Sequence, residues 1–208
     1  VLKCNPIKNN IFIDNNIKAT FNLLDSAKNY WSNKINKNRD SFLFIHISTD
    51  EVYGSLDKEG FFNENSPYKP NSPYSASKAS SDHLVRAWHS TYSFPSIITN
   101  CSNNYGPWQF PDKLIPVIIN NALNKEKIPI YGKGENIRDW LFVEDHIRAL
   151  ILIALNGNVG GNYCIGSGQE KTNLEIAMDI CQILDKYYPH NKPHKQLIDF
   201  TVDRLGHD

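Results

Sequence analysis

Tyr74 and Lys78 stand four residues apart in the segment Tyr-Ser-Ala-Ser-Lys. In a helix this spacing puts both side chains on one face, one turn apart. A phenol with a pKa of about 10 is a poor base at neutral pH, but a neighbouring ammonium group favours the phenolate and lowers that pKa. We therefore expect Tyr74 to remove a proton from a hydroxyl group. A chance pair on an ordinary helix remains the alternative.

A second group that could do chemistry is Thr49-Asp50-Glu51, directly after an apolar run. Two carboxyl groups this close raise the pKa of one of them, so that one stays protonated as an acid while the other ionises as a base. The alternative is a solvated acidic turn that ends a strand. If the apolar run before them is a strand of a parallel sheet, Asp50 and Glu51 lie at its carboxyl end, where a ligand is expected.

The elements that must position these residues are visible in the pattern. Residues 42–47 and 96–100 are short apolar runs, typical of strands buried on both faces of a parallel sheet. His46, inside the first run, is interpreted as a packed core residue. Ser72 followed by Pro73 predicts the start of a helix that reaches about Tyr92.

Helices and strands alternate along the rest of the chain. Apolar spacing predicts a helix within residues 11–31, and Thr172 with Glu175 predicts a capping box for a later helix. The other expected elements are helices at about 111–124, 144–155 and 172–187, strands at 128–131, 140–142, 162–165 and 199–202, and loops at 32–40, 54–73 and 103–107. This order predicts the α/β class, with a doubly wound parallel sheet.

Composition narrows the function classes. The chain has 208 residues, with 22 Lys+Arg against 22 Asp+Glu, which argues against nucleic-acid binding by bulk charge. No apolar run approaches the roughly 20 residues of a membrane span, and no signal peptide opens the sequence. Cys4, Cys101, Cys164 and Cys181 are too far apart for a zinc motif, so no metal is expected. We expect a cytoplasmic protein with no nucleic-acid or membrane partner.

Several segments together carry a resemblance to a known family. They are residues 48–54 (Ser-Thr-Asp-Glu-Val-Tyr-Gly), 72–79 (Ser-Pro-Tyr-Ser-Ala-Ser-Lys-Ala), 102–107, 110–116, 130–134, 137–146 and 203–208. In these the chain resembles the dTDP-glucose 4,6-dehydratases of the extended short-chain dehydrogenase/reductase superfamily. The Tyr-x-x-x-Lys pair marks only the superfamily, whereas Thr-Asp-Glu before Val-Tyr-Gly is characteristic of the dehydratases.

The resemblance implies conversion of dTDP-glucose to dTDP-4-keto-6-deoxyglucose with bound NAD. It assigns the sugar 4-hydroxyl proton to Tyr74, the C5 proton to Glu51 and protonation of the departing 6-hydroxyl to Asp50. Thr49 would bind the 4-oxygen, and Lys78 would hold the cofactor ribose and tune Tyr74. The cofactor performs the hydride chemistry while the protein orients it.

The resemblance also implies a binding pocket. Asn104 would contact the cofactor and Asn103 the substrate, and Arg138 suits a diphosphate because a guanidinium offers a bidentate fork. The other implied substrate-binding residues are Lys113, Leu114, Pro129, Ile130, Tyr131, Asn173, Asp203, Arg204 and His207. A surface pair of Arg138 with Asp139 or Glu144, and a helix-capping role for Asn173, remain alternatives.

The sequence departs from the family pattern near both ends. It contains no Gly-x-Gly-x-x-Gly or Gly-x-x-Gly-x-x-Gly motif, which would hold a pyrophosphate. Asn15 replaces a family Thr, Ala19 a Gly and Leu205 a Pro. We therefore interpret the chain as a fragment without the cofactor-phosphate loop, an incomplete Rossmann-type sheet with a smaller C-terminal α/β substrate domain.

On this interpretation residues 1–107 are the remainder of the NAD-binding domain. Residues 108–208 are mainly the nucleotide-sugar domain, partly interleaved with the first and truncated. The complete protein is expected to be a homodimer. Two alternatives stay open: another NAD-dependent nucleotide-sugar epimerase or decarboxylase, against which the Asp50-Glu51 pair argues, and an inactive fragment that only binds nucleotide sugar.

Overall fold

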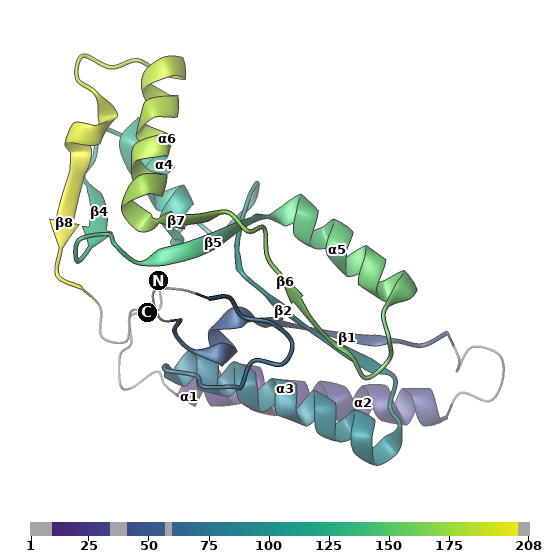
Figure 1. Ribbon diagram of the computed structural model, residues 1–208. Helices are drawn as coiled ribbons and strands as arrows, with labels where there is room; N and C mark the ends of the chain where they lie inside the picture. Colours follow the sequence, from purple (N-terminus) through teal and green to yellow (C-terminus); the bar gives the residue numbers. More distant parts are fainter. Residues whose placement is uncertain (1–9, 34–40, 57–59, 204–208) are drawn as a thin grey trace. The chain divides into compact units, whose positions relative to one another are not determined.

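The computed structural model describes residues 10–33, 41–56 and 60–203 (Figure 1). It divides into two compact units. The first unit contains the described residues up to Ser102 together with Asp145–Ile165, and the second contains Asn103–Glu144 and the described residues from Gly166 onward. The division into domains at residues 107 and 108 stays a prediction about the complete protein.

The sheet of the first unit is parallel, with strand order β1-β2-β6. Its strands are β1 (Phe44–Thr49), β2 (Ser96–Cys101) and β6 (Asn162–Ile165). Thr49 pairs with Cys101, and Cys101 pairs with Ile165, so the three strands end side by side. The predicted strands are confirmed, although β1 begins two residues later than expected. Phe42 contributes its ring to the core instead, where it packs against Phe94.

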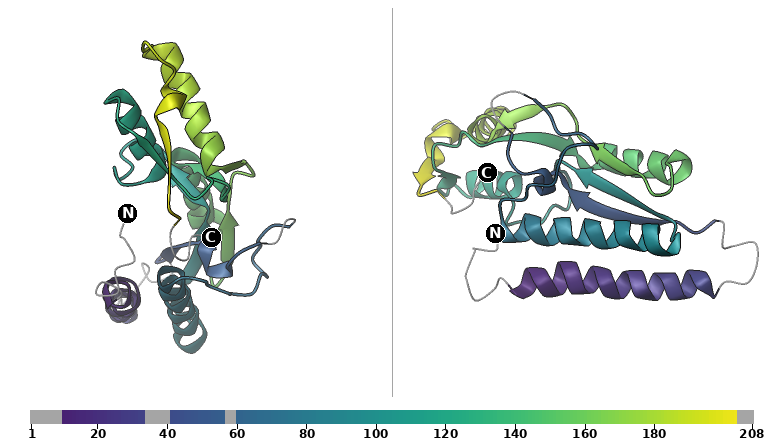
Figure 2. Two further views of the ribbon diagram at one scale, coloured as in Figure 1. Left: turned by 90° about the vertical axis from the view of Figure 1, so that its left-hand side faces the viewer. Right: turned by 60° about the horizontal axis from the view of Figure 1, so that its bottom comes forward.

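Helices on one side of this sheet complete the core of the first unit. The predicted helix over residues 11–31 is confirmed: α1 (Asn10–Phe12), the π-helical turn η2 (Ile13–Lys18) and α2 (Ala19–Ser32) are continuous. The α3 helix (Pro73–Tyr92) packs against β1 and β2, and α2 lies alongside α3 (Figure 2). Leu24, Val85 and Phe94 are buried between them. Of the predicted loop at 32–40, residues 34–40 lie outside the described part.

The second unit has its own sheets and core. In it β5 (Ile137–Phe142) pairs in parallel with β3 (Asn103–Tyr105) and antiparallel with β7 (Glu170–Thr172). The strands β4 (Ile128–Tyr131) and β8 (Ile198–Thr201) form a parallel pair. These elements pack with α4 (Leu114–Leu123), α6 (Asn173–Tyr187) and the short helix η4 (His194–Leu197) around Ile118, Ile130 and Ala177.

Several predicted boundaries are wrong. Asn103 and Asn104 form the strand β3 and not a loop, because their backbones pair with Trp140 and Leu141 of β5. Helix α4 begins at Leu114, since residues 111–113 form a turn in which the Lys113 amide donates to the Phe110 carbonyl. β7 and η4 were not predicted, and α5 (Val143–Asn156) is one residue longer at each end than expected.

The α/β class itself is confirmed, with parallel strands in both units. Within the described ranges no helix is long and apolar enough to cross a membrane. No cluster of His, Cys, Asp and Glu suited to a metal ion occurs in residues 10–33, 41–56 and 60–203.

Candidate active site

Thr49 ends β1 and starts a short 3₁₀ helix, η3 (Asp50–Tyr53). Its Oγ1 accepts a hydrogen bond from the Glu51 amide at 3.3 Å and donates one to Asp50 Oδ1, also at 3.3 Å. Asp50 is half-buried and Glu51 is exposed. The acidic pair therefore projects from a capped helical turn at the carboxyl end of the strand, where open parallel sheets bind ligands.

The residues after the acidic pair anchor it. Val52 and Tyr53 are buried, and Gly54 closes η3 with φ of 89°. A Cβ on Gly54 would lie 2.3 Å from the Lys69 carbonyl oxygen, so only glycine fits this close approach. The Val-Tyr-Gly segment thus holds the acidic pair at the surface while its own side chains enter the core.

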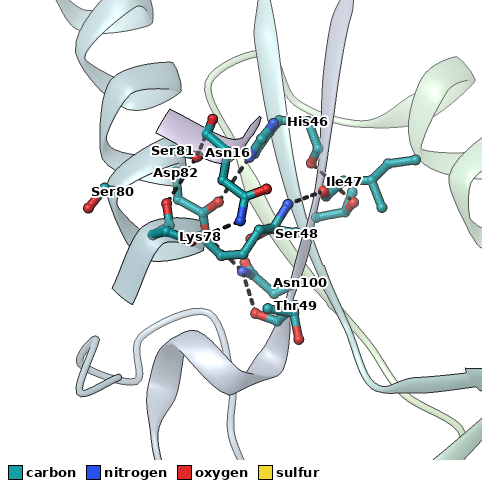
Figure 3. Close-up of polar contacts among 12 residues, drawn as sticks. Asn16, His46, Ile47, Ser48, Thr49, Lys78, Ser80, Ser81, Asp82 and Asn100 are labelled. Atoms are coloured by element: carbon teal, nitrogen blue, oxygen red, sulfur yellow. Dashed lines mark hydrogen bonds and ion pairs between the residues drawn. The ribbon is translucent and has the colours of Figure 1, made fainter. Parts of the chain in front are cut away.

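Helix α3 presents the Tyr-Lys pair to the same edge. Ser72 caps the helix by a capping box with Ser75, and Pro73 is its first residue, as predicted. Lys78 Nζ donates to the carbonyl oxygen of Ile47 in β1 at 2.9 Å (Figure 3). Burial lowers the pKa of Lys78, against a smaller opposing effect of Asp82. The one-turn spacing therefore places both groups beside the end of β1.

The protonation of Tyr74 differs from the prediction. Burial raises the pKa of Tyr74 to about 12, and the carboxylates of Glu51 and, less strongly, Asp50 add to the rise. The expectation that the pKa of Tyr74 is lowered is wrong for this structure, because burial and the neighbouring carboxylates disfavour the phenolate. The phenol is neutral at pH 7 here. Asp50 and Glu51 nevertheless act electrostatically on Tyr74, so the three groups share one site.

A buried polar cluster behind the site was missed by the sequence reasoning. Asn100 and Asp82 are each 1% exposed, and the Asn100 amide donates to Asp82 Oδ2 at 3.0 Å. The His46 side chain is 11% exposed, with Nε2 3.1 Å from Asp82 Oδ1, so it is a packed residue as predicted but faces a carboxylate. Asp82 follows Lys78 by four residues, and this same-face spacing was the available signal.

Apart from Thr49, the described residues expected to bind nucleotide sugar lie in the second unit. Asn103 and Asn104 are in β3, and Gln109 Nε2 donates to the Asn104 carbonyl at 2.8 Å. Lys113 is exposed at the start of α4, whereas Leu114 packs on the core. Ile130 is 1% exposed within that core, and its carbonyl accepts from Thr201 Oγ1, so its side chain is a core residue and not a surface for a ligand. Its neighbours Pro129 and Tyr131 are half-buried.

Three further predicted residues surround the turn between β4 and β5. Asn173 is buried, and its backbone amide donates a hydrogen bond to the Asn136 carbonyl at 3.1 Å. Arg138 Nη1 donates to the Ile137 carbonyl, and Asp203 lies against Gly132. Asp139 accepts hydrogen bonds from Ser167 and Gln169. Arg204 and His207 lie outside the described residues.

The residues present fit a dinucleotide in part. Tyr74 and Lys78 offer a hydroxyl and an ammonium group at the carboxyl edge of a parallel sheet, the place where such cofactors bind. The 208 residues hold no glycine-rich phosphate motif. The hydroxyl and ammonium groups therefore fit part of a dinucleotide, and its pyrophosphate finds no glycine-rich loop in this sequence.

A parallel α/β sheet with a Tyr-x-x-x-Lys helix at its carboxyl edge defines the Rossmann-type short-chain dehydrogenase/reductase class. Within that class, residues 7–207 match the family model described as GDP-mannose 4,6 dehydratase, and the chain belongs to this family. This confirms the resemblance to dehydratases drawn from the motifs.

Individual relatives agree. The chain is 52% identical over 206 residues to dTDP-glucose 4,6-dehydratase 1 of Escherichia coli, covering 95% of this chain and 57% of the relative. It is 55% identical over 203 residues to the dTDP-glucose 4,6-dehydratase of Neisseria gonorrhoeae, covering 95% and 58%. The Streptomyces venezuelae dTDP-glucose 4,6-dehydratase, solved with NAD bound, has a TM-score of 0.84 at 40% identity, covering 97% of this chain and 57% of that one. The chain thus spans little more than half the length of these relatives.

Proposed function

We propose that the chain carries the proton-transferring residues of an NAD-dependent dTDP-glucose 4,6-dehydratase, which converts dTDP-glucose to dTDP-4-keto-6-deoxyglucose. The observation that carries the proposal is the contact of η3, which bears Asp50 and Glu51, with α3, which bears Tyr74, at the carboxyl end of β1. An acid, a base and a phenol at the carboxyl edge of the sheet suit a reaction that moves several protons on one sugar. The names of the relatives support the same reaction.

Each residue then has a role that its position supports. Tyr74 removes the proton of the sugar 4-hydroxyl, and Thr49 donates a hydrogen bond to the same oxygen. Once C4 is a ketone the C5 proton is acidic, so the exposed Glu51 removes it while the half-buried Asp50 protonates the leaving 6-hydroxyl. Bound NAD supplies the acceptor and later the donor of the hydride. Lys78 holds its ribose.

Tyr74 needs added positive charge to act as a base. Its pKa of about 12 is set by burial and by carboxylates. Bound NAD would bring positive charge to this site, which together with the Lys78 ammonium group would favour the phenolate. Proton removal by Tyr74 is therefore expected only with the cofactor bound.

The second unit supplies the nucleotide-sugar pocket in this proposal. Asn103, Arg138 and Asn173 contact the substrate, and Asn104 contacts the cofactor. The remaining pocket residues are Lys113, Leu114, Pro129, Ile130, Tyr131, Asp203, Arg204 and His207.

We also propose that the complete protein is a cytoplasmic homodimer. The wide spacing of the four cysteines supports a reducing compartment. Phe21 and Leu23 of α2 and Tyr92 of α3 are 46%, 58% and 45% exposed, and such apolar side chains on neighbouring helices suit a second copy.

The test is incubation of the chain with dTDP-glucose and NAD, followed by mass spectrometry of the sugar nucleotide. Loss of one water supports the proposal, whereas epimerisation leaves the mass unchanged. Glu51→Gln should lower the rate of water loss at least about 100-fold, because it removes a general base. Glu126→Gln, at an exposed glutamate of the second unit, is the matched control. Binding of dTDP-glucose without turnover would favour the inactive-fragment alternative.

A further inference from the structure

Asn100 joins three elements of the first unit. It is the fifth of six residues in β2 and 1% exposed. Its Nδ2 donates to the Thr49 carbonyl at 3.1 Å and to Asp82 Oδ2 at 3.0 Å (Figure 3). Its Oδ1 accepts from the Tyr53 hydroxyl at 3.2 Å. Both amide hydrogens and the amide oxygen are therefore used. One side chain ties the end of β1, the end of η3 and the middle of α3 to the central strand.

Asp82 holds Asn100 in that orientation. Its Oδ2 also accepts from the Tyr68 hydroxyl at 2.9 Å, and its Oδ1 lies 3.1 Å from His46 Nε2. Two donors, the Tyr68 hydroxyl and the Asn100 amide, bind Asp82 Oδ2, and because a buried carboxylate is costly without such partners they hold the side chain in place. Asp82 lies one turn beyond Lys78 and two beyond Tyr74 on α3. The helix that carries the Tyr-Lys pair is thus bonded, through Asn100, to the residue that precedes the acidic pair.

We propose that Asn100, oriented by Asp82, is a positioning residue that fixes the segment Thr49–Tyr53 against α3 and so sets the placement of Asp50 and Glu51 relative to Tyr74. The inference rests on the proposed function for its catalytic meaning. The positioning itself is a property of the first unit and is measurable without turnover. None of the three bonds links residues close in sequence: Asn100 lies 51, 18 and 47 positions from Thr49, Asp82 and Tyr53.

The test compares Asn100→Ser with Thr99→Val in the full chain. Thr99 is the preceding residue of β2, is 0% exposed, and donates one hydrogen bond from Oγ1 to the His46 carbonyl of β1. Its replacement therefore removes a buried bond between the same strands but leaves the contacts to Thr49 and η3. Hydrogen exchange of peptides covering residues 49–54 is measured by mass spectrometry, with urea unfolding as the measure of overall stability.

We expect Asn100→Ser to raise exchange in residues 49–54 about tenfold more than Thr99→Val does, after correction for overall stability. Tyr53→Phe removes one of the three bonds of Asn100, together with the contacts of the hydroxyl to Asn162 and Cys164. It should give a smaller rise at the same residues and keeps the test open if Asn100→Ser fails to fold. Equal exchange at residues 49–54 in Asn100→Ser or Tyr53→Phe and in Thr99→Val would overturn the proposal.

Turnover separates this proposal from the proposed function. If the wild-type chain removes water from dTDP-glucose, Asn100→Ser should lower kcat at least tenfold with KM changed less than twofold, because the proposed nucleotide-sugar pocket residues of the second unit are untouched. A rise in KM with kcat unchanged would contradict the proposal that Asn100 places Asp50 and Glu51 for catalysis. If the wild type shows no turnover, the proposed function fails for this chain, while the exchange result still decides the positioning role.

Discussion

Tyr74 shows how its surroundings set the chemistry of one residue. The phenol lies on a helix one turn from an ammonium group, yet its pKa is raised to about 12 because burial and the Glu51 and Asp50 carboxylates outweigh that ammonium. Desolvation disfavours the phenolate, and nearby negative charges disfavour it further. The carboxylates assigned to the proposed elimination step therefore add to the effect of burial and raise the pKa of Tyr74 further above neutral pH.

Replacing Tyr74 tests this pKa directly. The ordinary pKa of a tyrosine phenol is 10.0, and the folded chain raises the pKa of Tyr74 to about 12. The folded state therefore prefers the neutral phenol, which contributes stability below pH 10 that is lost as pH rises through 12. In Tyr74→Phe, absorbance titration at the phenolate band should lose a step near pH 12, and stability should fall less between pH 10 and 12. Tyr187→Phe, at an exposed tyrosine, is the control. Retention of the step near pH 12 in Tyr74→Phe would contradict the assignment.

At the scale of elements, α3 organises the site. Its capping box at Ser72 and Ser75 sets where the helix begins, and Tyr74, Lys78 and Asp82 follow at four-residue spacing. The first two reach the edge of the sheet, and the third is buried against Asn100. A change in where α3 begins would therefore shift Tyr74 and Lys78 at the proposed site and also Asp82, which holds Asn100.

Removal of the cap should weaken this element. Ser72→Ala deletes the oxygen that accepts from the Ser75 amide at 3.0 Å, and we expect a loss of about 1 kcal/mol in the free energy of unfolding. Ser80→Ala is the control within the same helix, since Ser80 Oγ bonds only the Ala76 carbonyl four residues back and its replacement by alanine should change stability by less than about 0.5 kcal/mol. Urea unfolding measures both variants. An equal loss in the two would show that the capping box does not support the helix.

At the scale of the whole molecule, each unit has a core of its own. The first unit closes around Leu24, Val85 and Phe94, and the second around Ile118, Ile130 and Ala177. The chain returns from the second unit to the first at Asp145–Ile165, which supplies β6 to the first sheet. The proposed catalytic residues and most of the proposed pocket residues thus depend on different cores.

Two neighbouring isoleucines of α4 test the core of the second unit. Ile118 is 0% exposed and Ile119 is 38% exposed. Ile118→Ala should cost about 2–5 kcal/mol of stability because it removes buried methyl groups and leaves a cavity, whereas Ile119→Ala should cost less than about 1 kcal/mol. Hydrogen exchange of α4 and α6 measures the difference. Similar protection in the two variants would contradict the packing described for this unit.

Local patterns predicted much of this structure. The sequence predicted the strands β1 and β2, the Ser72 and Thr172 caps, and the segments carrying Thr49-Asp50-Glu51 and Tyr74-Lys78, because each depends on near neighbours in the chain. The short strands β3 and β7 were missed, since three residues carry no measurable periodicity and are defined only by pairing with β5.

The sequence by itself determined the dehydratase resemblance, the α/β class and the residue types at the edge of the sheet, because helical spacing and capping are local interactions. Only the tertiary structure decided that Asn100 binds Thr49, Asp82 and Tyr53, that Ile130 is buried in a core, and that the pKa of Tyr74 rises. These properties depend on contacts between groups far apart in the chain and on the exclusion of water between them. Neither the long-range contacts nor the exclusion of water leaves a local pattern in the sequence.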